Sequence, residues 1–420
     1  MPKFSPKRRI SSTVALCLLV CPPSQSEPKE VGQDQTAFTS FRNYKDHIEA
    51  GGIPAYYGQT DRERLIELLS FLRIPSSSQL LVFSTTSLQL SKISPGNPRA
   101  IYFNDNLYLG YVPGGQIEVI EVDKEEGILP YIFSLPPSRS ASHPQILQSD
   151  RCMRCHDSDK TGFVPGLLLE SVVPQKGGGT LDRLITNSVG HQIPYENRFG
   201  GWFLTGSNQY PGSWANSLGS FVRGKLRRDE ISPNHAYLKH NYPQATSEAV
   251  AHAILSHQIG FTNQCIRLGF LHEDGDEKSF EQALENLIGY TLFVDEANLP
   301  TPLRLDTQFA REFEASFPKS PPQYNLKTLN LRNRLFEIRC SYMLLSKAFQ
   351  NLPSALKQKF FARLRQILLD PGNNLSEVER KRIHEALNFH LPLYRKMKKA
   401  PERTPFFKRQ KYELILNRGA

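Results

Sequence analysis

The sequence predicts an α+β fold with a β-rich N-terminal part, a central segment around a paired-cysteine motif, and a helical C-terminal half. Two patterns lead to this prediction. Short apolar or alternating runs separated by turn residues fill the first third of the chain, which is typical of strands. From about residue 247 onward, apolar residues recur instead at helical spacing. With 420 residues, 39% of them hydrophobic, the chain can bury one to three packed units.

The β-rich region covers residues 27–137 and contains one expected helix. Residues 61–72 read DRERLIELLSFL, in which leucines repeat at helical spacing after an acidic start. Strands are then expected at 80–84, 100–103, 107–112, 116–122 and 131–135. Asn104-Asp105-Asn106 and Pro113-Gly114-Gly115 are typical turn sequences, so they predict reversals between neighbouring strands.

The rest of the chain divides into a central segment (138–230), a helical region (245–394) and a basic tail (395–420). Within the central segment, a short helix is expected at 145–157 and strands at 167–173 and 200–205. Prolines punctuate the helical region. Its helices are expected at 247–271, 278–294, 306–316, 331–349, 354–369 and 376–389.

Cys152-Met153-Arg154-Cys155-His156 carries the clearest chemical signal. C-x-x-C-H is the spacing at which two thiols attach a haem covalently and the adjacent imidazole ligates its iron. A C-x-x-C disulfide is one alternative, and half of a zinc site is another. A complete zinc site would need a second C-x-x-C or H-x-x-x-H pair, which the sequence lacks. We therefore expect one covalent haem c per chain, attached at Cys152 and Cys155 with His156 as proximal ligand, which makes residues 138–230 a cytochrome c-like, haem-binding segment.

Two further residues are expected to support the haem. Pro165 follows His156 in a Gly/Pro turn, and its carbonyl is the candidate acceptor for the proton on the other ring nitrogen of that histidine. Arg198 is a candidate partner for a haem propionate, because guanidinium pairs bidentately with carboxylate, and Arg151 and Arg154 are alternatives.

The distal iron ligand is open to several interpretations. His191 lies on a loop bounded by glycine and proline, which can close over a haem face, so it is the favoured candidate. The alternatives are His252, His257, Met343 or an open site. Cys265 and Cys340 either form a disulfide or are buried free thiols, and the sequence does not bring them together.

The N-terminus predicts export. Four basic residues precede the apolar run 14–20, which is typical of a secretory signal peptide ending near residue 26. The expected location is therefore the periplasm or another exported part of the cell envelope. Lipoprotein processing at Cys21 is the less favoured alternative, because Val20 is not the small residue that should precede the cysteine.

The net charge of +10 is concentrated at the two ends of the chain. The signal segment supplies four of these charges. Between Arg395 and Tyr412 there are eight basic residues and one acidic residue, so the rest of the chain is close to neutral. This distribution argues against a nucleic-acid-binding domain. The tail is either a solvated extension or a site of peripheral contact with an anionic membrane or an acidic partner.

Several segments resemble a family of exported bacterial proteins described as cytochrome c domain-containing. Besides the C-x-x-C-H motif, they are Tyr102-Phe103-Asn104-Asp105, Tyr111-Val112-Pro113-Gly114-Gly115, the stretch 198–206 and Cys340-Ser341-Tyr342. The resemblance implies haem binding and electron transfer with an unidentified redox partner protein. The leading hypothesis is thus an exported single-haem c-type cytochrome. The alternatives are a peroxidase-like haem enzyme with an open distal site and a haem-based gas-binding or sensor module.

Overall fold

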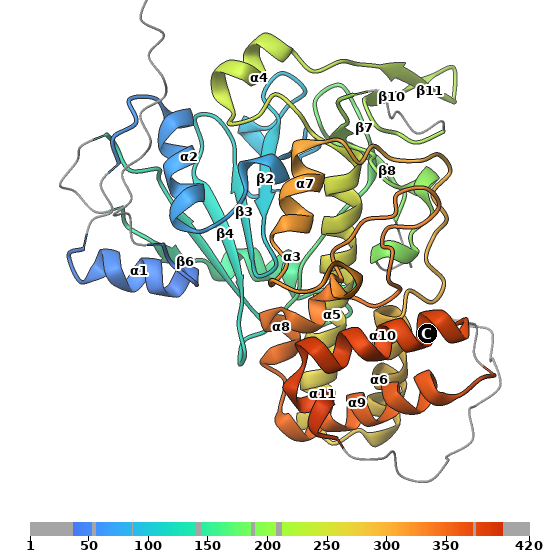
Figure 1. Cartoon of the computed structure of the whole chain (residues 1–420). Helices are drawn as coiled ribbons and strands as arrows, with labels where there is room; N and C mark the ends of the chain where they lie inside the picture. The colour runs from blue at the N-terminus through green and yellow to red at the C-terminus, as the bar shows by residue number, and fades with distance from the viewer. Residues whose placement is uncertain are drawn as a thin grey trace, which may run out of the picture. The chain divides into compact units, whose positions relative to one another are not determined.

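Figure 1 shows a computed structural model of the chain, which describes residues 37–52, 56–85, 87–138, 144–185, 190–206, 212–372 and 375–397. The predicted signal peptide, including Cys21, and the basic tail from Lys398 onward lie outside these residues. The described residues all belong to one compact unit. The α+β prediction is confirmed, because a β-rich N-terminal half is followed by a helical C-terminal half.

A seven-stranded antiparallel sheet dominates the described part of the N-terminal half. Its strand order is β6-β5-β4-β3-β2-β1-β9. The strands are β1 (Leu80–Val82), β2 (Arg99–Phe103), β3 (Leu107–Tyr111), β4 (Ile117–Val122), β5 (Ile128–Phe133), β6 (Leu147–Gln148) and β9 (Trp202–Phe203). Strands β1 to β5 correspond to the five predicted ones. The side chain of Asn104 accepts from the backbone of Asn106 and Leu107, which explains the turn between β2 and β3.

The sheet buries a different core on each face. Because side chains alternate along a strand, Tyr102 and Leu109 point to one face, while Phe103 and Tyr108 point to the other. The first face packs against α1 (Phe41–Glu49), α2 (Asp61–Phe71) and α4 (His235–Asn241). The second face joins the core around α5 (Ala249–Asp274).

Helix α5 is the centre of the helical half. Every residue from 249 to 262 is buried, so this part is enclosed on all sides. The other helices of this half are α6 (Glu277–Thr291), α7 (Gln308–Ala315), α8 (Lys347–Gln350), α9 (Ser354–Leu369), α10 (Glu377–His390) and α11 (Pro392–Lys396). Helix α11 runs beyond the predicted end of the helical region at residue 394, and its Tyr394 is fully buried.

One helix prediction was wrong, and another was too long. Residues 331–349 form a hydrogen-bonded loop followed by the short helices η8 (Tyr342–Leu345) and α8. The backbone N–H of Leu335 donates to the Glu296 carboxylate and that of Ser341 to the Thr291 carbonyl, so the buried apolar residues there serve tertiary contacts. Residues 145–157 contain strand β6 and two short helices, η3 (Asp150–Cys152) and α3 (Met153–His156).

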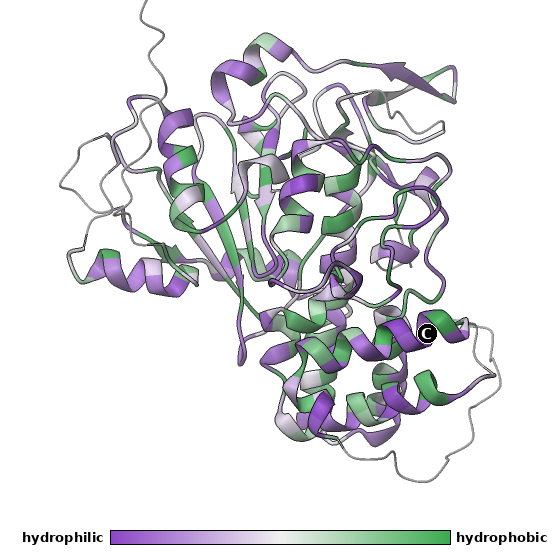
Figure 2. Cartoon of the chain, viewed as in Figure 1, coloured by the Kyte–Doolittle hydropathy of each residue, from purple (hydrophilic) through white to green (hydrophobic). Residues whose placement is uncertain are grey.

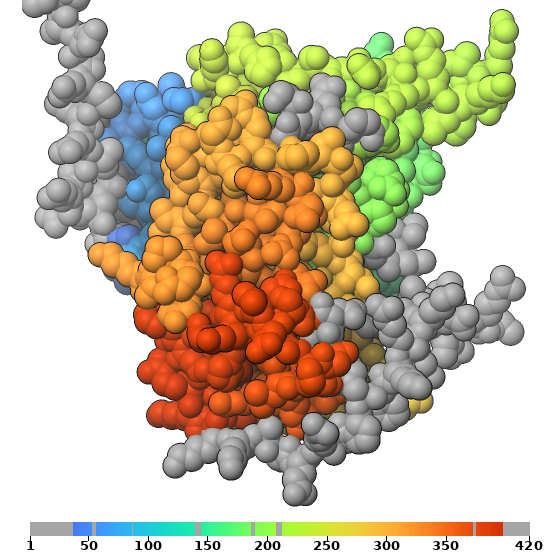
Figure 3. All heavy atoms as spheres, turned by 45° about the vertical axis from the view of Figure 1, so that its right-hand side comes forward, coloured from blue at the N-terminus to red at the C-terminus, as the bar shows by residue number. Residues whose placement is uncertain are grey.

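Two small sheets were only partly predicted. Strand β7 (Val172–Pro174) covers the end of the expected strand 167–173 and pairs with β8 (Thr180–Arg183). Strands β10 (Ser217–Val222) and β11 (Lys225–Glu230) form a hairpin that the sequence pattern did not predict. Figure 2 shows this hairpin as largely hydrophilic, and in Figure 3 it projects at the upper right.

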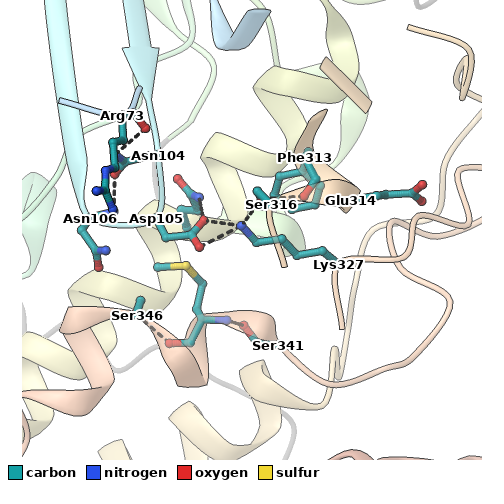
Figure 4. Close-up of polar contacts among 12 residues, drawn as sticks. Arg73, Asn104, Asp105, Asn106, Phe313, Glu314, Ser316, Lys327, Ser341 and Ser346 are labelled. Atoms are coloured by element: carbon teal, nitrogen blue, oxygen red, sulfur yellow. Dashed lines mark hydrogen bonds and ion pairs between the residues drawn. The ribbon is translucent and has the colours of Figure 1, made fainter. Parts of the chain in front are cut away.

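An ion pair links the β2–β3 turn to the helical half. The Lys327 ammonium group donates to both carboxylate oxygens of Asp105, at 2.9 and 2.8 Å, and to the Ser316 hydroxyl at 2.9 Å (Figure 4). The same ammonium group lies 4.7 Å from the centroid of the Phe313 ring. Asp105 and Tyr342 therefore both contact the Lys327 ammonium group, since the Tyr342 ring also faces it at 4.9 Å.

Within the described ranges, no helix has both the length and the apolar character needed to cross a membrane.

Candidate functional site

The C-x-x-C-H motif follows directly on the edge strand β6. The backbone N–H of Ser149 donates to Pro130 of β5, and the N–H of Cys152 donates back to Ser149, which turns the chain into η3 and α3. Residues three apart on such a turn share one face. Cys155 is exposed, Cys152 is partly buried, and both are free thiols. Burial raises the pKa of the Cys152 thiol. The two sulfur atoms are therefore available on one side of a short helical turn.

The His156 imidazole is held in one tautomer by a backbone carbonyl. Its Nδ1 lies 2.8 Å from the oxygen of Gly166, and the Gly166 N–H donates to the His156 carbonyl at 2.7 Å. A carbonyl oxygen only accepts, so Nδ1 carries the proton and Nε2 keeps its lone pair. Burial also lowers the pKa of His156, which favours the neutral ring. Neutral imidazole with a free Nε2 is the form that ligates a metal.

The prediction for Pro165 was wrong by one residue. The carbonyl that accepts from His156 belongs to Gly166, whereas Pro165 lies against the β4–β5 turn, where a Cβ on Gly127 would come within 2.8 Å of the Pro165 oxygen. Asn263 of α5 explains the register. Its side chain accepts from the N–H of Leu167 at 2.7 Å and donates to the carbonyl of the same residue at 2.9 Å, which fixes the loop to the helix.

A partly covered strip of the sheet lies beside the motif. Five residues are aligned across β2 to β6 on one face: Ile101, Gly110, Glu118, Ile132 and Leu147. Ile101, Ile120 and Ile132 on this face are partly exposed, and Ile101 and Ile120 also pack against the core around α5. Leu147 is 49% exposed and lies only five residues before Cys152. An apolar strip next to two free thiols is suited to pack against a flat apolar group.

An ion pair crosses this strip. Arg99 of β2 reaches over Gly110 to form a salt bridge with Glu118 of β4. Arg99 and Glu118 both influence the pKa of His156 and of Cys152, so the pair lies close to the motif. The Arg99 Nε atom is buried and has no hydrogen-bond partner among the described residues. The sequence does not predict this pair, because strand register brings the two residues together and no motif marks them.

Arg198 is not near the motif in its described contacts. Its guanidinium is buried and donates to the carbonyls of Ile193, at 2.8 Å, and His191, at 3.0 Å. It also lies 4.1 Å from the centroid of the Tyr195 ring. Arg198 thus organises the loop of residues 190–198, and its pairing with a propionate stays a prediction. Arg151 and Arg154 are exposed beside the cysteines.

The structure does not bring His191 to His156. His191 is fully buried, its Nδ1 lies 2.8 Å from Nδ1 of His257, and its ring stacks on Tyr290 at 3.9 Å between centroids. Burial lowers the pKa of His191 well below its usual value and that of His257 to about 3, so both rings are neutral.

The other distal candidates are also engaged elsewhere. The Nε2 of His257 lies 2.8 Å from the Ser341 hydroxyl. His252 packs against the rings of Phe199 and Trp202, at 4.6 and 5.0 Å between centroids. Met343 is fully buried in the helical core. None of the described contacts of these side chains includes a motif residue. Cys265 and Cys340 are both buried free thiols rather than a disulfide.

No protein-family model, no curated protein and no solved structure matches this chain. Among the residues that the structure describes, no group of three or more His, Cys, Asp and Glu side chains could hold a metal ion. A haem differs from a bare ion, because its porphyrin supplies four nitrogen ligands and one histidine from the protein suffices.

Proposed function

We propose that this protein is an exported c-type cytochrome with one covalent haem, which transfers electrons. Cys152 and Cys155 are the attachment points, and His156 is the proximal ligand. The observation that supports this proposal best is the hydrogen bond from His156 Nδ1 to the Gly166 carbonyl, 2.8 Å long, which leaves Nε2 free beside two unpaired thiols. When bound, the haem supplies one-electron redox chemistry at its iron.

The residues present fit a haem in three respects. The thiols share one face of a helical turn and are not oxidised to a disulfide. The partly exposed isoleucines of the sheet strip offer apolar contact for a porphyrin. Exposure of Cys155 leaves the motif open to a group arriving from outside. A structural disulfide or a zinc half-site would need neither the oriented imidazole nor the apolar strip.

The chain's own groups then have distinct tasks. The Gly166 carbonyl orients the His156 ring and raises its basicity toward iron. Asn263 holds that carbonyl in place by its two hydrogen bonds to Leu167. The sheet strip excludes water from one side of the site.

A second candidate function is a peroxidase-like haem enzyme or a haem-based gas-binding module. The observation that favours it is the burial of His191, His252, His257 and Met343 away from the motif, which leaves no distal ligand among the described contacts. An open sixth position permits binding of peroxide or a diatomic gas. Absorption spectra of the reduced protein with and without carbon monoxide separate the two, because a six-coordinate electron carrier does not bind the gas readily.

Covalent attachment is tested by haem staining after denaturing electrophoresis of protein expressed with a c-type maturation system. The wild type should stain, and C152A/C155A should not. The matched control is C265A/C340A, which removes the two buried cysteines and should still stain. A stained band in C152A/C155A, or no stain in a soluble wild type, would overturn the proposal.

A further inference from the structure

The sheet strip beside the motif contains a charged pair in an otherwise apolar surface. Arg99 and Glu118 are flanked by Ile101, Ile120 and Ile132 on the same face. Their side chains are only 19% and 13% exposed. A charge that is largely removed from water acts over a longer distance than a surface charge, because the surrounding medium screens it less.

Gly110 makes this arrangement possible. It lies on β3 between the two charged residues, directly opposite Ile101 on one side and Glu118 on the other. A Cβ at this position would come within 2.5 Å of Arg99 Nη2 and 2.7 Å of Nε, so any side chain would displace the guanidinium. The guanidinium therefore passes over Gly110, where no side chain blocks it.

Glu118 has a second hydrogen-bond partner, whereas Arg99 has one N–H group without a partner among the described residues. Glu118 accepts a hydrogen bond from the Ser87 hydroxyl at 2.9 Å, which anchors the carboxylate independently of Arg99. Arg99 keeps a buried Nε–H without a partner among the described residues. A buried donor without a partner costs free energy, so the guanidinium depends on its salt bridge with Glu118 to keep its charge in this position.

We propose that the Arg99–Glu118 pair forms the charged wall of the haem site and sets the haem midpoint potential, the two residues acting with opposite sign. This inference rests on the proposed function. Reduction adds one electron at the iron, so a nearby positive charge stabilises the reduced state and a nearby negative charge destabilises it. Neutralising Arg99 should lower the midpoint potential, and neutralising Glu118 should raise it.

The test is redox titration of the holoprotein and of R99Q, E118Q and the double variant R99Q/E118Q. We expect the midpoint potential to fall in R99Q, to rise in E118Q and to stay near the wild-type value in R99Q/E118Q. R99K keeps the charge and should stay close to the wild type. The controls are R304Q and D306N, which neutralise an exposed ion pair on the loop before α7 and should shift nothing.

Equal or absent shifts in R99Q and E118Q would overturn the inference, because a structural disturbance has no reason to change sign with the charge removed. If R99Q does not carry haem, the rise in E118Q and the unchanged value in R99K decide the question. A wild type without haem would instead overturn the proposed function, so the two failures are distinguishable.

Discussion

The imidazole of His156 and the backbone of Gly166 are joined twice, by Nδ1 to the carbonyl oxygen at 2.8 Å and by the Gly166 N–H to the His156 carbonyl at 2.7 Å. The two bonds close a loop that runs from His156 to Gly166. This loop fixes the direction of the histidine before any cofactor is present. The Asn263 side chain ties Leu167, the residue directly after this loop, to α5 by two hydrogen bonds.

Replacement of Asn263 by alanine should loosen this loop without removing the haem attachment points. Leu167 would lose both hydrogen bonds to the side chain, and we expect a loss of about 1–3 kcal/mol in unfolding free energy. The haem should stay covalently bound, while its midpoint potential changes because the histidine is less firmly oriented. Urea unfolding and redox titration measure the two effects. N286A, which alters an exposed amide on α6, serves as the control. A wild-type potential in N263A would show that the loop does not depend on Asn263.

His191 should be structural rather than an iron ligand. Its ring is stacked on Tyr290 and hydrogen-bonded to His257, so H191A should leave a cavity and an unpaired buried nitrogen. We expect a destabilisation of about 2–4 kcal/mol with an unchanged absorption spectrum of the reduced haem. Thermal unfolding and visible spectroscopy of the same sample check this. A change to a high-spin spectrum would contradict it and restore His191 as the distal ligand.

The buried histidines should make the protein less stable in acid. Burial lowers the pKa of His252 from 6.5 to about 3. Between pH 6.5 and about pH 3 the unfolded chain binds a proton at His252 that the folded chain does not. The contribution of His252 to the unfolding free energy is therefore complete above pH 6.5 and is lost as the pH falls through this range. H252F removes this proton and packs against Phe199 and Trp202. The slope of unfolding free energy against pH in this range should decrease by up to about 1.4 kcal/mol per pH unit.

Urea unfolding at a series of pH values measures that slope. The control is H235Q, which changes an exposed histidine at the start of α4 and should leave it unaltered. An identical slope in H252F and the wild type would mean that His252 titrates alike in the folded and unfolded chain.

The ion pair between Asp105 and Lys327 should show an asymmetric response to mutation. The Lys327 side chain is 5% exposed and that of Asp105 is 33% exposed. D105N leaves a buried ammonium group without its carboxylate, which should cost roughly 3–5 kcal/mol. K327M leaves a carboxylate that water can reach, so its cost should be smaller. A double-mutant cycle by urea unfolding measures both. A larger loss in K327M would contradict this order.

Much of the fold could be predicted where local pattern and tertiary structure agree. Helix α9 has the predicted bounds, and α2 begins at the predicted Asp61 behind a capping box formed by Thr60 and Glu63. The hairpin β10–β11 could not be found from apolar alternation, because residues 225–230 are mostly charged. Its one local signal is the turn at Arg223 and Gly224, both with positive φ.

Only the part of the candidate site that lies close together in the sequence could be predicted. The C-x-x-C-H motif indicated the three chemical groups, and the nearby Gly/Pro turn indicated a carbonyl partner one residue away from the observed Gly166. Arg99 and Glu118 were missed because their proximity to the motif depends on strand register and on the missing side chain of Gly110, which no local pattern specifies.

Intact-protein mass spectrometry of the chain purified after export tests the central claim most directly. We predict a single species with the mass of the chain cleaved near residue 26 plus one haem, and loss of that added mass in C152A/C155A. A wild-type chain at its bare polypeptide mass, or lighter by the two hydrogens of a disulfide between Cys152 and Cys155, would contradict the assignment of a c-type cytochrome.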